Sequence, residues 1–347
     1  MEPQNGQDQD GRAEAPADTE AKPVVRSRAY QGGRLVAENF PMADLSDWIK
    51  PDDATVWLDL PDPTHDQLIE LRDELGLHYL AIEDAIQQRQ RPKLDRYEGH
   101  LLISAYAVRF EPDESLSSVM VLGFITPKVL VTVHHAGELP IEEVVARWDE
   151  TSDLADQGVG FLLHGLIDYI ADGYFDALQL LDDSVEDLSD RVFDDHPGPQ
   201  TDEALRRTFE LRRSLLLARH VITPMREVVN SLMRRDLDVV SRELAPYYQD
   251  VYDHVLRAAE WTDNLRDLIG TIRETHLTIQ GNRMNLIMKK VTSWAAIIAV
   301  PTAVTGFYGQ NVPYPGFGTT AGFWTSVGLM ICISVALYIL FRRRDWL

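Results

Sequence analysis

The strongest constraint on this chain is a stretch near its C-terminus that contains no Lys, Arg, Asp, Glu or His. It runs for 51 residues between Lys290 and Arg342. A helix needs about 20 apolar residues to cross a bilayer, and this stretch holds two such segments, 291–311 and 321–341. The alternative is a buried helical pair in a soluble core, but soluble helices keep a polar face that these segments lack. The sequence therefore predicts two transmembrane helices, joined by a short loop at 312–320 whose prolines and glycines cannot continue a helix.

The charges that flank these segments predict their orientation. Lys289 and Lys290 precede the first segment, three arginines lie in the tail 342–347, and the connecting loop carries no charge. Positively charged flanks favour the cytoplasmic side, so we expect a multi-pass protein of the cytoplasmic membrane with both termini in the cytosol. Residues 1–24 are polar and lack the apolar centre of a signal peptide, so we expect a disordered tail there.

The charge of the whole chain limits its partners. The formal net charge is −22, which repels nucleic acid and attracts cations. The sequence contains no glycine-rich phosphate loop and no strand-to-helix nucleophile turn. We also find no nucleophile–base constellation, so the motifs argue against an enzyme.

Residues 25–155 alternate between strand and helix signals and are predicted to form a cytosolic α/β domain. Strands are expected at 54–60, 100–110, 117–126 and 129–135, with an amphipathic helix at 67–75. His134 and His135 end the last of these strands. Because no partner ligands stand at usable spacing, we interpret both histidines as strand residues rather than metal ligands.

Residues 156–245 are predicted to form a cytosolic helical hairpin. The segment 161–195 carries ten acidic residues and one basic residue, whereas 203–235 carries eight arginines. A Pro-Gly-Pro turn at 197–199 separates them, so we expect an antiparallel pair with complementary faces. The acidic run is equally a candidate cation-attracting surface.

A single long helix is expected to connect the cytosolic part with the membrane. No proline interrupts the chain between Pro246 and Pro301, and apolar or small residues recur at helical spacing through the stalk 246–290. From Asp250 to Asn311 such a helix would be about 90 Å long. The predicted fold class is an α+β membrane protein with an α/β domain, a helical hairpin, a stalk helix continuous with transmembrane helix 1, and then transmembrane helix 2.

One narrow stripe of this helix consists mostly of small or uncharged polar residues. Its members are Glu274, Gly281, Asn285, Met288, Thr292, Ala295, Ala299, Thr302 and Gly306. In a membrane such a stripe allows close helix packing, and it can equally line a central hole among symmetry-related copies. Two transmembrane helices cannot enclose a channel alone, so a pore would require an oligomer.

The end of the first transmembrane segment, Tyr308-Gly309-Gln310-Asn311, resembles the Tyr-Gly-Met-Asn signature of the CorA family of magnesium channels. Further similar segments follow the family's order, namely Glu83-Asp84 with Gln90-Arg91-Pro92-Lys93, then Pro224-Met225-Arg226-Glu227, then 248–254, and the Arg-Arg-Arg-Asp-Trp-Leu terminus. Together these segments span most of residues 75–347. A single tripeptide would be weak, but the ordered set is specific.

The resemblance implies a homopentameric channel for Mg²⁺ uptake, with Co²⁺ and Ni²⁺ as further candidate ions, in which five copies of the first helix line the pore. Gly309, Gln310 and Asn311 would then form the outer mouth. Neutral amide oxygens there can accept hydrogen bonds from the water shell that Mg²⁺ releases reluctantly. Capping of the helix end is the alternative role for Asn311.

The resemblance also implies roles for residues deeper in the chain. Thr302 would form a polar ring, Ala299, Val291 and Met288 an apolar section that gates by dewetting, and Glu274 an acidic ring nearer the cytosol. Asp84 and Asp250 occupy the positions of the family's sensor sites between subunits, where bound Mg²⁺ would hold the pore shut. Each aspartate is alternatively a surface residue or a helix cap.

Several departures from the family pattern leave the ion preference open. Gln310 replaces the usual Met, Ala299 is smaller than the expected gate residue, and the outer loop lacks an acidic residue. A zinc transporter of the related ZntB type, passive or proton-coupled, is therefore an alternative. A membrane-anchored scaffold or signalling protein is a second alternative, and it predicts that Thr302 and Asn311 can be replaced freely.

Overall fold

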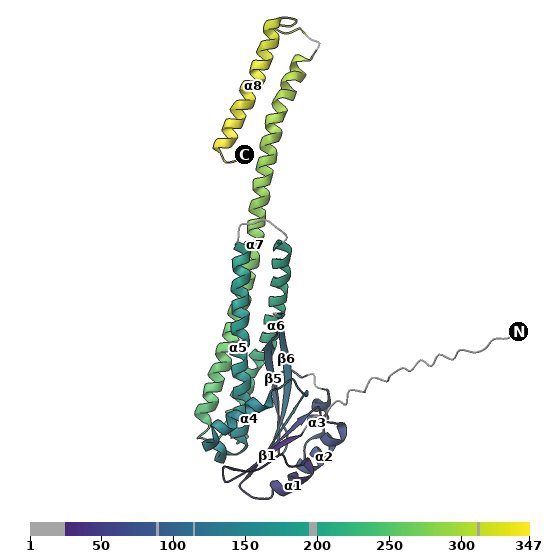
Figure 1. Ribbon diagram of the computed structural model, residues 1–347, viewed down its shortest axis with the longest axis vertical. Coiled ribbons are helices and arrows are strands. Elements are labelled where there is room, and N and C mark those ends of the chain that lie inside the picture. The colour runs from purple at the N-terminus through teal and green to yellow at the C-terminus, as the bar shows by residue number, and fades with distance from the viewer. Residues whose placement is uncertain (1–24, 88–89, 114, 194–199, 311–312) are drawn as a thin grey trace, which may run out of the picture. The chain divides into compact units, whose positions relative to one another are not determined.

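A computed structural model describes residues 25–87, 90–113, 115–193, 200–310 and 313–347 (Figure 1). The expected disordered tail, the Pro-Gly-Pro turn and Asn311 lie outside these residues. The chain divides into two compact units. The first holds the residues up to Ser184 together with Phe209–Leu265, and the second holds Val185–Thr208 together with Arg266–Leu347.

The first unit is built around a seven-stranded sheet in the order β2-β1-β3-β7-β6-β5-β4. The strands are β1 (Arg26–Gln31), β2 (Arg34–Glu38), β3 (Ala54–Pro61), β4 (Lys93–Arg96), β5 (Leu101–Phe110), β6 (Leu116–Ile125) and β7 (Val129–His134). The central neighbours β3 and β7 run parallel, with Val56 opposite Val129, and the other adjacent pairs are antiparallel. The predicted α/β domain is confirmed.

The four predicted strands agree with β3, β5, β6 and β7 to within one residue at each end. Helix α2 (His65–Leu75) begins two residues earlier than expected, because Thr64 and Gln67 form a reciprocal capping box. Strands β1, β2 and β4 were not predicted. Both β2 and β4 are short and lie at the edges of the sheet, where charged residues weaken the alternating pattern.

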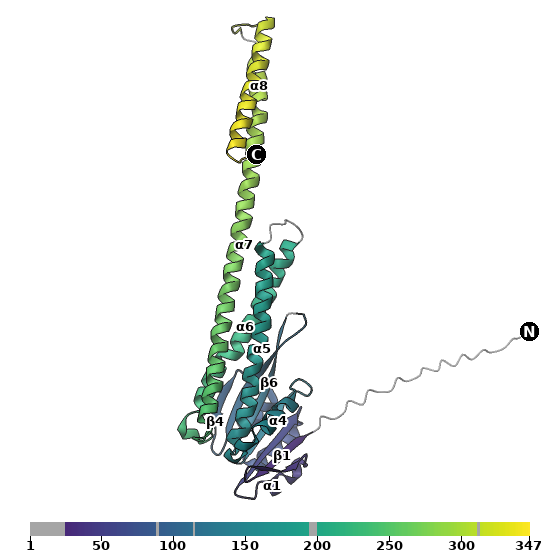
Figure 2. The same ribbon diagram turned by 60° about the vertical axis from the view of Figure 1, so that its left-hand side comes forward.

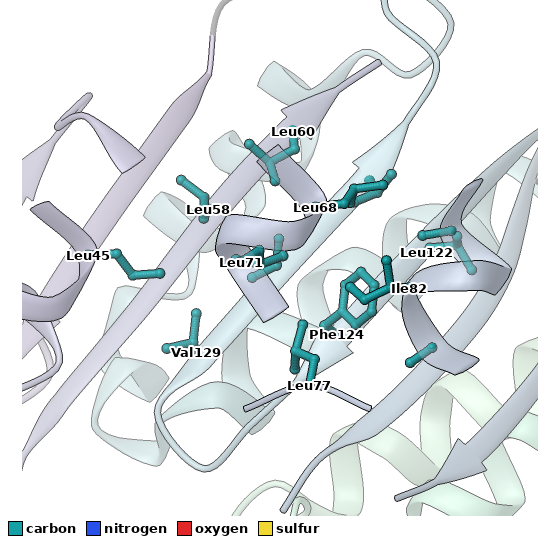
Figure 3. Close-up of a cluster of buried hydrophobic side chains, with 14 of the residues drawn as sticks. Leu45, Leu58, Leu60, Leu68, Leu71, Leu77, Ile82, Leu122, Phe124 and Val129 are labelled. Carbon is teal, nitrogen blue, oxygen red and sulfur yellow. The ribbon is translucent and has the colours of Figure 1, made fainter. Parts of the chain in front are cut away.

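Helices cover both faces of the sheet. On one face, side chains of α1 (Leu45–Trp48), α2 and α3 (Tyr79–Gln87) pack on β3, β6 and β7, with Leu71 and Phe124 among the fully buried residues (Figure 3). On the other face, Trp57 of β3 meets Trp148 of α4 (Ile141–Glu150), with ring centroids 4.8 Å apart. Because both faces are buried, β3 and β7 have nearly continuous apolar sequences.

Three long helices follow the sheet. They are α5 (Val159–Phe193), α6 (Gln200–Leu232) and α7 (Ala245–Tyr308), and short 3-10 turns lie at Met42–Asp44, Ser152–Gln157 and Arg235–Leu237. In the first unit, α5 and α7 meet through the rings of Phe175 and Trp261, 6.1 Å apart. Helices α6 and α7 meet through the Arg219–Asp263 ion pair at 3.1 Å.

The acidic face of α5 has two sources of counter-charge. Near the end of α5, Asp187 lies 2.8 Å from Arg207 of α6, as the prediction of complementary helices requires. Near its beginning, Asp168 and Asp172 bind Arg147 of α4 instead. The sequence pattern alone did not indicate this contribution from α4.

Helix α7 is one continuous helix of 64 residues, which confirms a stalk that continues into the first apolar segment. It begins at Ala245, with Pro246 in the first turn, where a missing amide hydrogen costs no helical hydrogen bond. It ends at Tyr308, three residues before the expected end at Asn311. The predicted end of the helix was therefore wrong.

Helices α7 and α8 (Thr320–Arg343) are both long and apolar enough to cross a membrane. In their most apolar windows 11% and 0% of the residues are buried, which argues against the core of a soluble protein. Helix α8 runs back along α7 in both views (Figures 1 and 2). Helix α7 contains Pro301, and because proline has no amide hydrogen, the carbonyl of Ile297 has no helical donor.

A buried polar pair links the two parallel strands. Nε2 of His134 on β7 lies 3.1 and 3.2 Å from the two carboxylate oxygens of Asp59 on β3, and these side chains are 3% and 1% exposed. The hydroxyl of Thr132 also donates to Asp59. Burial alone would lower the pKa of His134, but Asp59 raises it above its ordinary value. His134 is thus a partner of Asp59 at the end of a strand, in agreement with its interpretation as a strand residue.

This pair predicts a pH dependence of stability. A histidine whose pKa is raised by folding stabilises the protein most below its unfolded pKa of about 6.5, and the stabilisation is lost as the pH rises through the folded value. We expect the free energy of unfolding to fall over that range. At pH 6 a His134→Asn variant should have a free energy of unfolding about 3 kcal/mol below that of the wild type, because Asp59 stays buried without its partner. Its free energy of unfolding should not show the decrease with pH that we expect for the wild type. Denaturant unfolding of the full chain in detergent between pH 6 and 9 measures both.

His135→Asn is the matched control, because His135 is exposed and pairs with the exposed Asp62. Its pH profile should follow the wild type. A His134→Asn profile parallel to the wild type would contradict the assignment of the slope to this pair.

Candidate functional site

Most of the predicted pore residues of α7 belong to its small and polar stripe, and Val291 lies beside that stripe. Glu274, Met288, Val291, Ala299 and Thr302 are all exposed in the single chain. Met288 and Val291 keep 56% and 58% of their surface, although both are apolar. Within the part of the chain that the structure describes, this stripe is therefore not used for packing.

The glycines of the same stripe support this conclusion. A Cβ atom built at Gly281 or Gly306 would have no neighbour within 4 Å. No contact inside the chain requires glycine at either position. Thr302 satisfies its hydroxyl locally, donating to the Ile298 carbonyl at 3.3 Å. The stripe is a continuous surface of mostly small side chains, which another copy of the helix can approach closely.

The signature segment begins where α7 ends. The amide of Gly309 donates to the Thr305 carbonyl at 2.8 Å, and the amide of Gln310 turns to the Phe307 carbonyl at 3.3 Å. The donor and acceptor are four residues apart in the first bond and three residues apart in the second, which is the tighter 3-10 pattern that commonly ends an α-helix. The end of the helix was predicted too far along the chain because the low helix propensity of Gly309 was not taken into account.

Close packing at the helix end explains why glycine occupies position 309. A Cβ atom there would lie 2.8 Å from the Thr305 carbonyl oxygen, so a larger residue forces the backbone to move. Tyr314 of the connecting loop packs on Tyr308, with ring centroids 5.0 Å apart. Gly309 and Gln310 are thus held at an ordered turn, and Asn311, the next residue of the signature, lies outside the described residues.

A second candidate site lies in the first unit, between α5 and α7. Asp168, Asp172 and His254 place one ligand atom each within 4.8 Å of one another. The Nδ1 atom of His254 lies 3.9 Å from the carboxylate of Asp250, one helical turn earlier. Burial lowers the pKa of His164, with the charges of Asp168 and Asp250 acting in the opposite direction. Three carboxylates and two imidazoles therefore share one region around the predicted sensor residue Asp250.

An internal cation already occupies part of this region. Arg147 binds Asp168, and its second terminal nitrogen lies 2.7 Å from Asp172. Burial alone would lower the pKa of Arg147, but both carboxylates raise it. Asp168, Asp172 and His254 were not predicted as ligands from the sequence. The usable signal was their spacing, since Asp168/Asp172 and Asp250/His254 each stand four residues apart on one helix face.

Asp84, the other predicted sensor residue, lies on α3 and is bound within its own subunit. Its carboxylate accepts from Lys93 at 2.7 Å and from Gln90 at 3.0 Å. Its side chain is 19% exposed. Lys93 also contacts Asp95 at 2.6 Å, and the two carboxylates raise the pKa of Lys93 against the effect of burial.

The structure therefore does not join Asp84 and Asp250 within one subunit. Asp84 is bound to Lys93, whereas Asp250 lies beside His254. Both sets of donors suit metal ions, with carboxylate oxygens matching Mg²⁺ and the imidazole of His254 matching Zn²⁺, Co²⁺ or Ni²⁺ more closely. A metal that bridges the two aspartates would have to do so between subunits, and this stays a prediction.

Comparisons with known proteins agree with these features. Residues 52–343 match the family model of the CorA-like Mg²⁺ transporter protein. The cobalt/magnesium transport protein CorA of Thermotoga maritima is 30% identical over 277 residues, 78% of this chain and 77% of that protein. A Bacillus subtilis protein, YfjQ, itself assigned only provisionally as a metal ion transporter, is 30% identical over 93% of this chain and 98% of its own length.

The fold is shared with a solved structure of the same kind. The complete structure of the CorA magnesium transporter from Methanocaldococcus jannaschii superposes with a TM-score of 0.75 at 23% identity, covering 93% of this chain and 99% of that one. The α/β domain, the long helix that continues into an apolar segment and the second apolar helix are thereby confirmed as the fold class. The zinc transport protein ZntB of Yersinia pseudotuberculosis is also similar, at 22% identity over 84% of this chain and 88% of its own.

Proposed function

This chain belongs to the family of CorA-like Mg²⁺ transporters, a family of divalent-cation transporters and not of enzymes, and on that basis we propose that it forms a homopentameric channel. The channel takes up Mg²⁺, with Co²⁺ and Ni²⁺ as further candidate ions, across the cytoplasmic membrane. Both termini lie in the cytosol, and Mg²⁺ bound between cytosolic domains closes the pore.

The exposed stripe of α7 is the observation that carries this proposal. A helix pair this apolar requires a bilayer, yet one side of α7 presents small and polar side chains that none of the described residues covers. A polar stripe is disfavoured against lipid. Copies of α7 around a water-filled path would cover it, and α8 would then face the lipid.

The stripe provides different chemistry at different depths. At the outer end Gly309, Gln310 and Asn311 offer neutral oxygens and amides that contact a hydrated ion without holding it tightly. Thr302, about two helical turns closer to the cytosol along α7, adds a ring of hydroxyl groups. A carboxylate at these levels would bind Mg²⁺ more strongly and release it more slowly.

The inner part of the pore is apolar and then acidic. Ala299, Val291 and Met288 form the section that stays dry when the pore is narrow. Glu274 follows towards the cytosol and concentrates cations at the inner mouth. Because Ala299 is small, Val291 and Met288 supply most of the bulk that closes this section.

Regulation involves Asp84 and Asp250 in neighbouring subunits. Bound Mg²⁺ would replace Lys93 as the partner of Asp84 and offset the repulsion between carboxylates. When Mg²⁺ is lost, Asp84 returns to Lys93 and the link between subunits is released. Each subunit thus has a partner ready for Asp84 in the metal-free state.

Ion flux in proteoliposomes tests the proposal. Purified protein is reconstituted with a fluorescent indicator inside the vesicles, and Mg²⁺, Co²⁺, Ni²⁺ and Zn²⁺ are added in turn. We expect Mg²⁺ to enter the vesicles, and to enter faster when the membrane potential is negative inside. Vesicles that stay impermeable to all four ions would refute the channel and favour a membrane-anchored scaffold.

Zinc transport is the second candidate function. It is favoured by His254, whose imidazole lies beside Asp168 and Asp172, and by the likeness to ZntB. Entry of Zn²⁺ that exceeds Mg²⁺ entry, and that depends on a proton gradient, would establish it. Equal rates with and without that gradient would leave a passive channel.

Gly309→Ala is expected to lower Mg²⁺ flux several-fold. The new Cβ would lie 2.8 Å from the Thr305 carbonyl oxygen, and relieving such overpacking costs about 1–3 kcal/mol. The turn that carries Gln310 must then shift. Gly328→Ala on α8 is the matched control, because a Cβ there meets nothing within 4 Å. Equal flux in both variants would show that the tight turn does not position the mouth.

A further inference from the structure

Five cationic side chains gather at one end of the membrane hairpin. Lys289 and Lys290 come from α7, and Arg342, Arg343 and Arg344 from the end of α8. All five are exposed. We call this group the basic collar. It lies entirely in the second compact unit.

The antiparallel packing of the two helices brings the five residues to one level. Lys290 stands about 27 Å before the end of α7 at Tyr308, and Arg342 about 33 Å after the start of α8 at Thr320, by the standard helical rise. The difference is about one helical turn. Both views show the end of α8 beside α7 rather than beyond it (Figures 1 and 2).

These lengths match a membrane. The hydrocarbon core of a bilayer is about 30 Å thick, so a hairpin whose turn lies at one surface places the collar at the other. The ring of Trp346 stacks on Phe341 next to the arginines, with centroids 5.7 Å apart and planes at 3°. Aromatic rings of this kind favour the headgroup level.

Acidic residues are scarce around the collar. Residues 275–344 contain no Asp or Glu in a chain whose net charge is −22. The nearest acidic residues in sequence are Glu274, about 22 Å along α7 from Lys289, and Asp345 in the tail. Among the described residues, the five side chains of the collar form no ion pair or hydrogen bond with an acidic group. Five cations that share one level with a single neighbouring carboxylate, Asp345, repel one another and favour an anionic ligand.

We propose that the basic collar binds the phosphate groups of anionic phospholipids in the leaflet that it faces. The arginine guanidinium groups fit phosphate oxygens in a bidentate way, and the two lysines add charge from the neighbouring helix. Clusters of four to eight basic residues beside a transmembrane helix are typical of anionic-lipid recognition. Orientation in the membrane requires only positive charge, whereas this surface selects among the lipids of one leaflet. It needs the hairpin to span a bilayer, but it does not need the protein to conduct any ion.

The test measures which lipids stay bound. The full chain is reconstituted into vesicles of equal parts phosphatidylglycerol and phosphatidylcholine and extracted in mild detergent, and the retained lipids are quantified by mass spectrometry. We expect phosphatidylglycerol to be enriched at least about threefold over phosphatidylcholine. The enrichment should fall as salt is raised before extraction, because the attraction is screened. Equal retention of the two lipids at low salt would overturn the proposal.

Charge variants locate the effect. The triple variant R342Q/R343Q/R344Q should lose most of the enrichment, and the triple lysine variant at the same positions should keep it. The control R212Q/R213Q/R226Q removes the same charge from exposed positions of α6 and should behave like the wild type. If the glutamine triple variant fails to insert into the membrane, the same lipid measurement is made on K289Q/K290Q, which should also reduce the enrichment. Full enrichment in the collar variants, or its loss in the α6 control, would also overturn the proposal.

Discussion

An Asn311→Ala variant is expected to conduct Mg²⁺ at least about tenfold more slowly than the wild type, equivalent to about 1.4 kcal/mol at the limiting step. In the proposed channel, the amide oxygens of Asn311 accept hydrogen bonds from the water shell of the ion. Alanine removes this acceptor from every subunit at once, so the hydrated ion loses a complete ring of partners. Initial rates in proteoliposomes with equal amounts of protein measure the effect.

Two further variants separate recognition from folding. Asn264→Ala removes an exposed amide from a part of α7 outside the stripe and outside the apolar segment, and should conduct at the wild-type rate. Asn311→Asp should bind Mg²⁺ more tightly and release it more slowly, so that its flux saturates at lower Mg²⁺. If Asn311→Ala conducts as well as Asn264→Ala, the signature residue does not select the ion.

Neutralising both sensor residues is expected to abolish most of the inhibition by internal Mg²⁺. In an Asp84→Asn/Asp250→Asn variant, the internal concentration that halves the flux should rise at least about tenfold, because two charged ligands are lost at the bridging site. Flux at low internal Mg²⁺ should stay near the wild-type value, since neither residue lies in the pore. The inhibition curve is measured with vesicles that are loaded with increasing concentrations of Mg²⁺ and assayed for entry of Co²⁺.

The matched control is Glu70→Gln/Asp153→Asn, which removes the same charge from exposed positions of the first unit. It should keep the wild-type inhibition curve. Lys93→Met offers a test in the opposite direction. It frees Asp84 from its partner at 2.7 Å, so Mg²⁺ should inhibit at lower concentration. An unchanged curve in the double aspartate variant would contradict the sensor role, while leaving the pore itself untouched.

The fold was predictable from sequence wherever one physical signal dominated. The apolar run at 54–60 and the uncharged stretch after Lys290 identify β3 and the hairpin because burial on all sides leaves no polar positions. Strands β2 and β4 escaped prediction because edge strands are short and carry charges. The end of α7 was misplaced because uncharged residues continue past Gly309, where the backbone leaves the helix.

The candidate site was less predictable than the fold. The stripe of α7 follows from helical periodicity, so Glu274, Met288 and Thr302 could be placed on one face in advance. The group of Asp168, Asp172 and His254 depends on how α5 packs on α7, and a sequence gives only the spacing within each helix. The role of Arg147 depends on a third helix. Any partners that these residues would find in the other subunits of the proposed pentamer are a property of that assembly, not of one chain.

Pro301 has a mechanical consequence for the membrane part of α7. With no amide at that position, the turn between Ile297 and Pro301 holds one backbone hydrogen bond fewer than any other turn of the span. Bending the helix there breaks less structure than bending it elsewhere, and a water molecule can satisfy the free carbonyl only if it reaches this depth. In the proposed channel, hydration from the pore and bending of the outer third of the membrane segment would thus be coupled at a single level, directly beside Thr302.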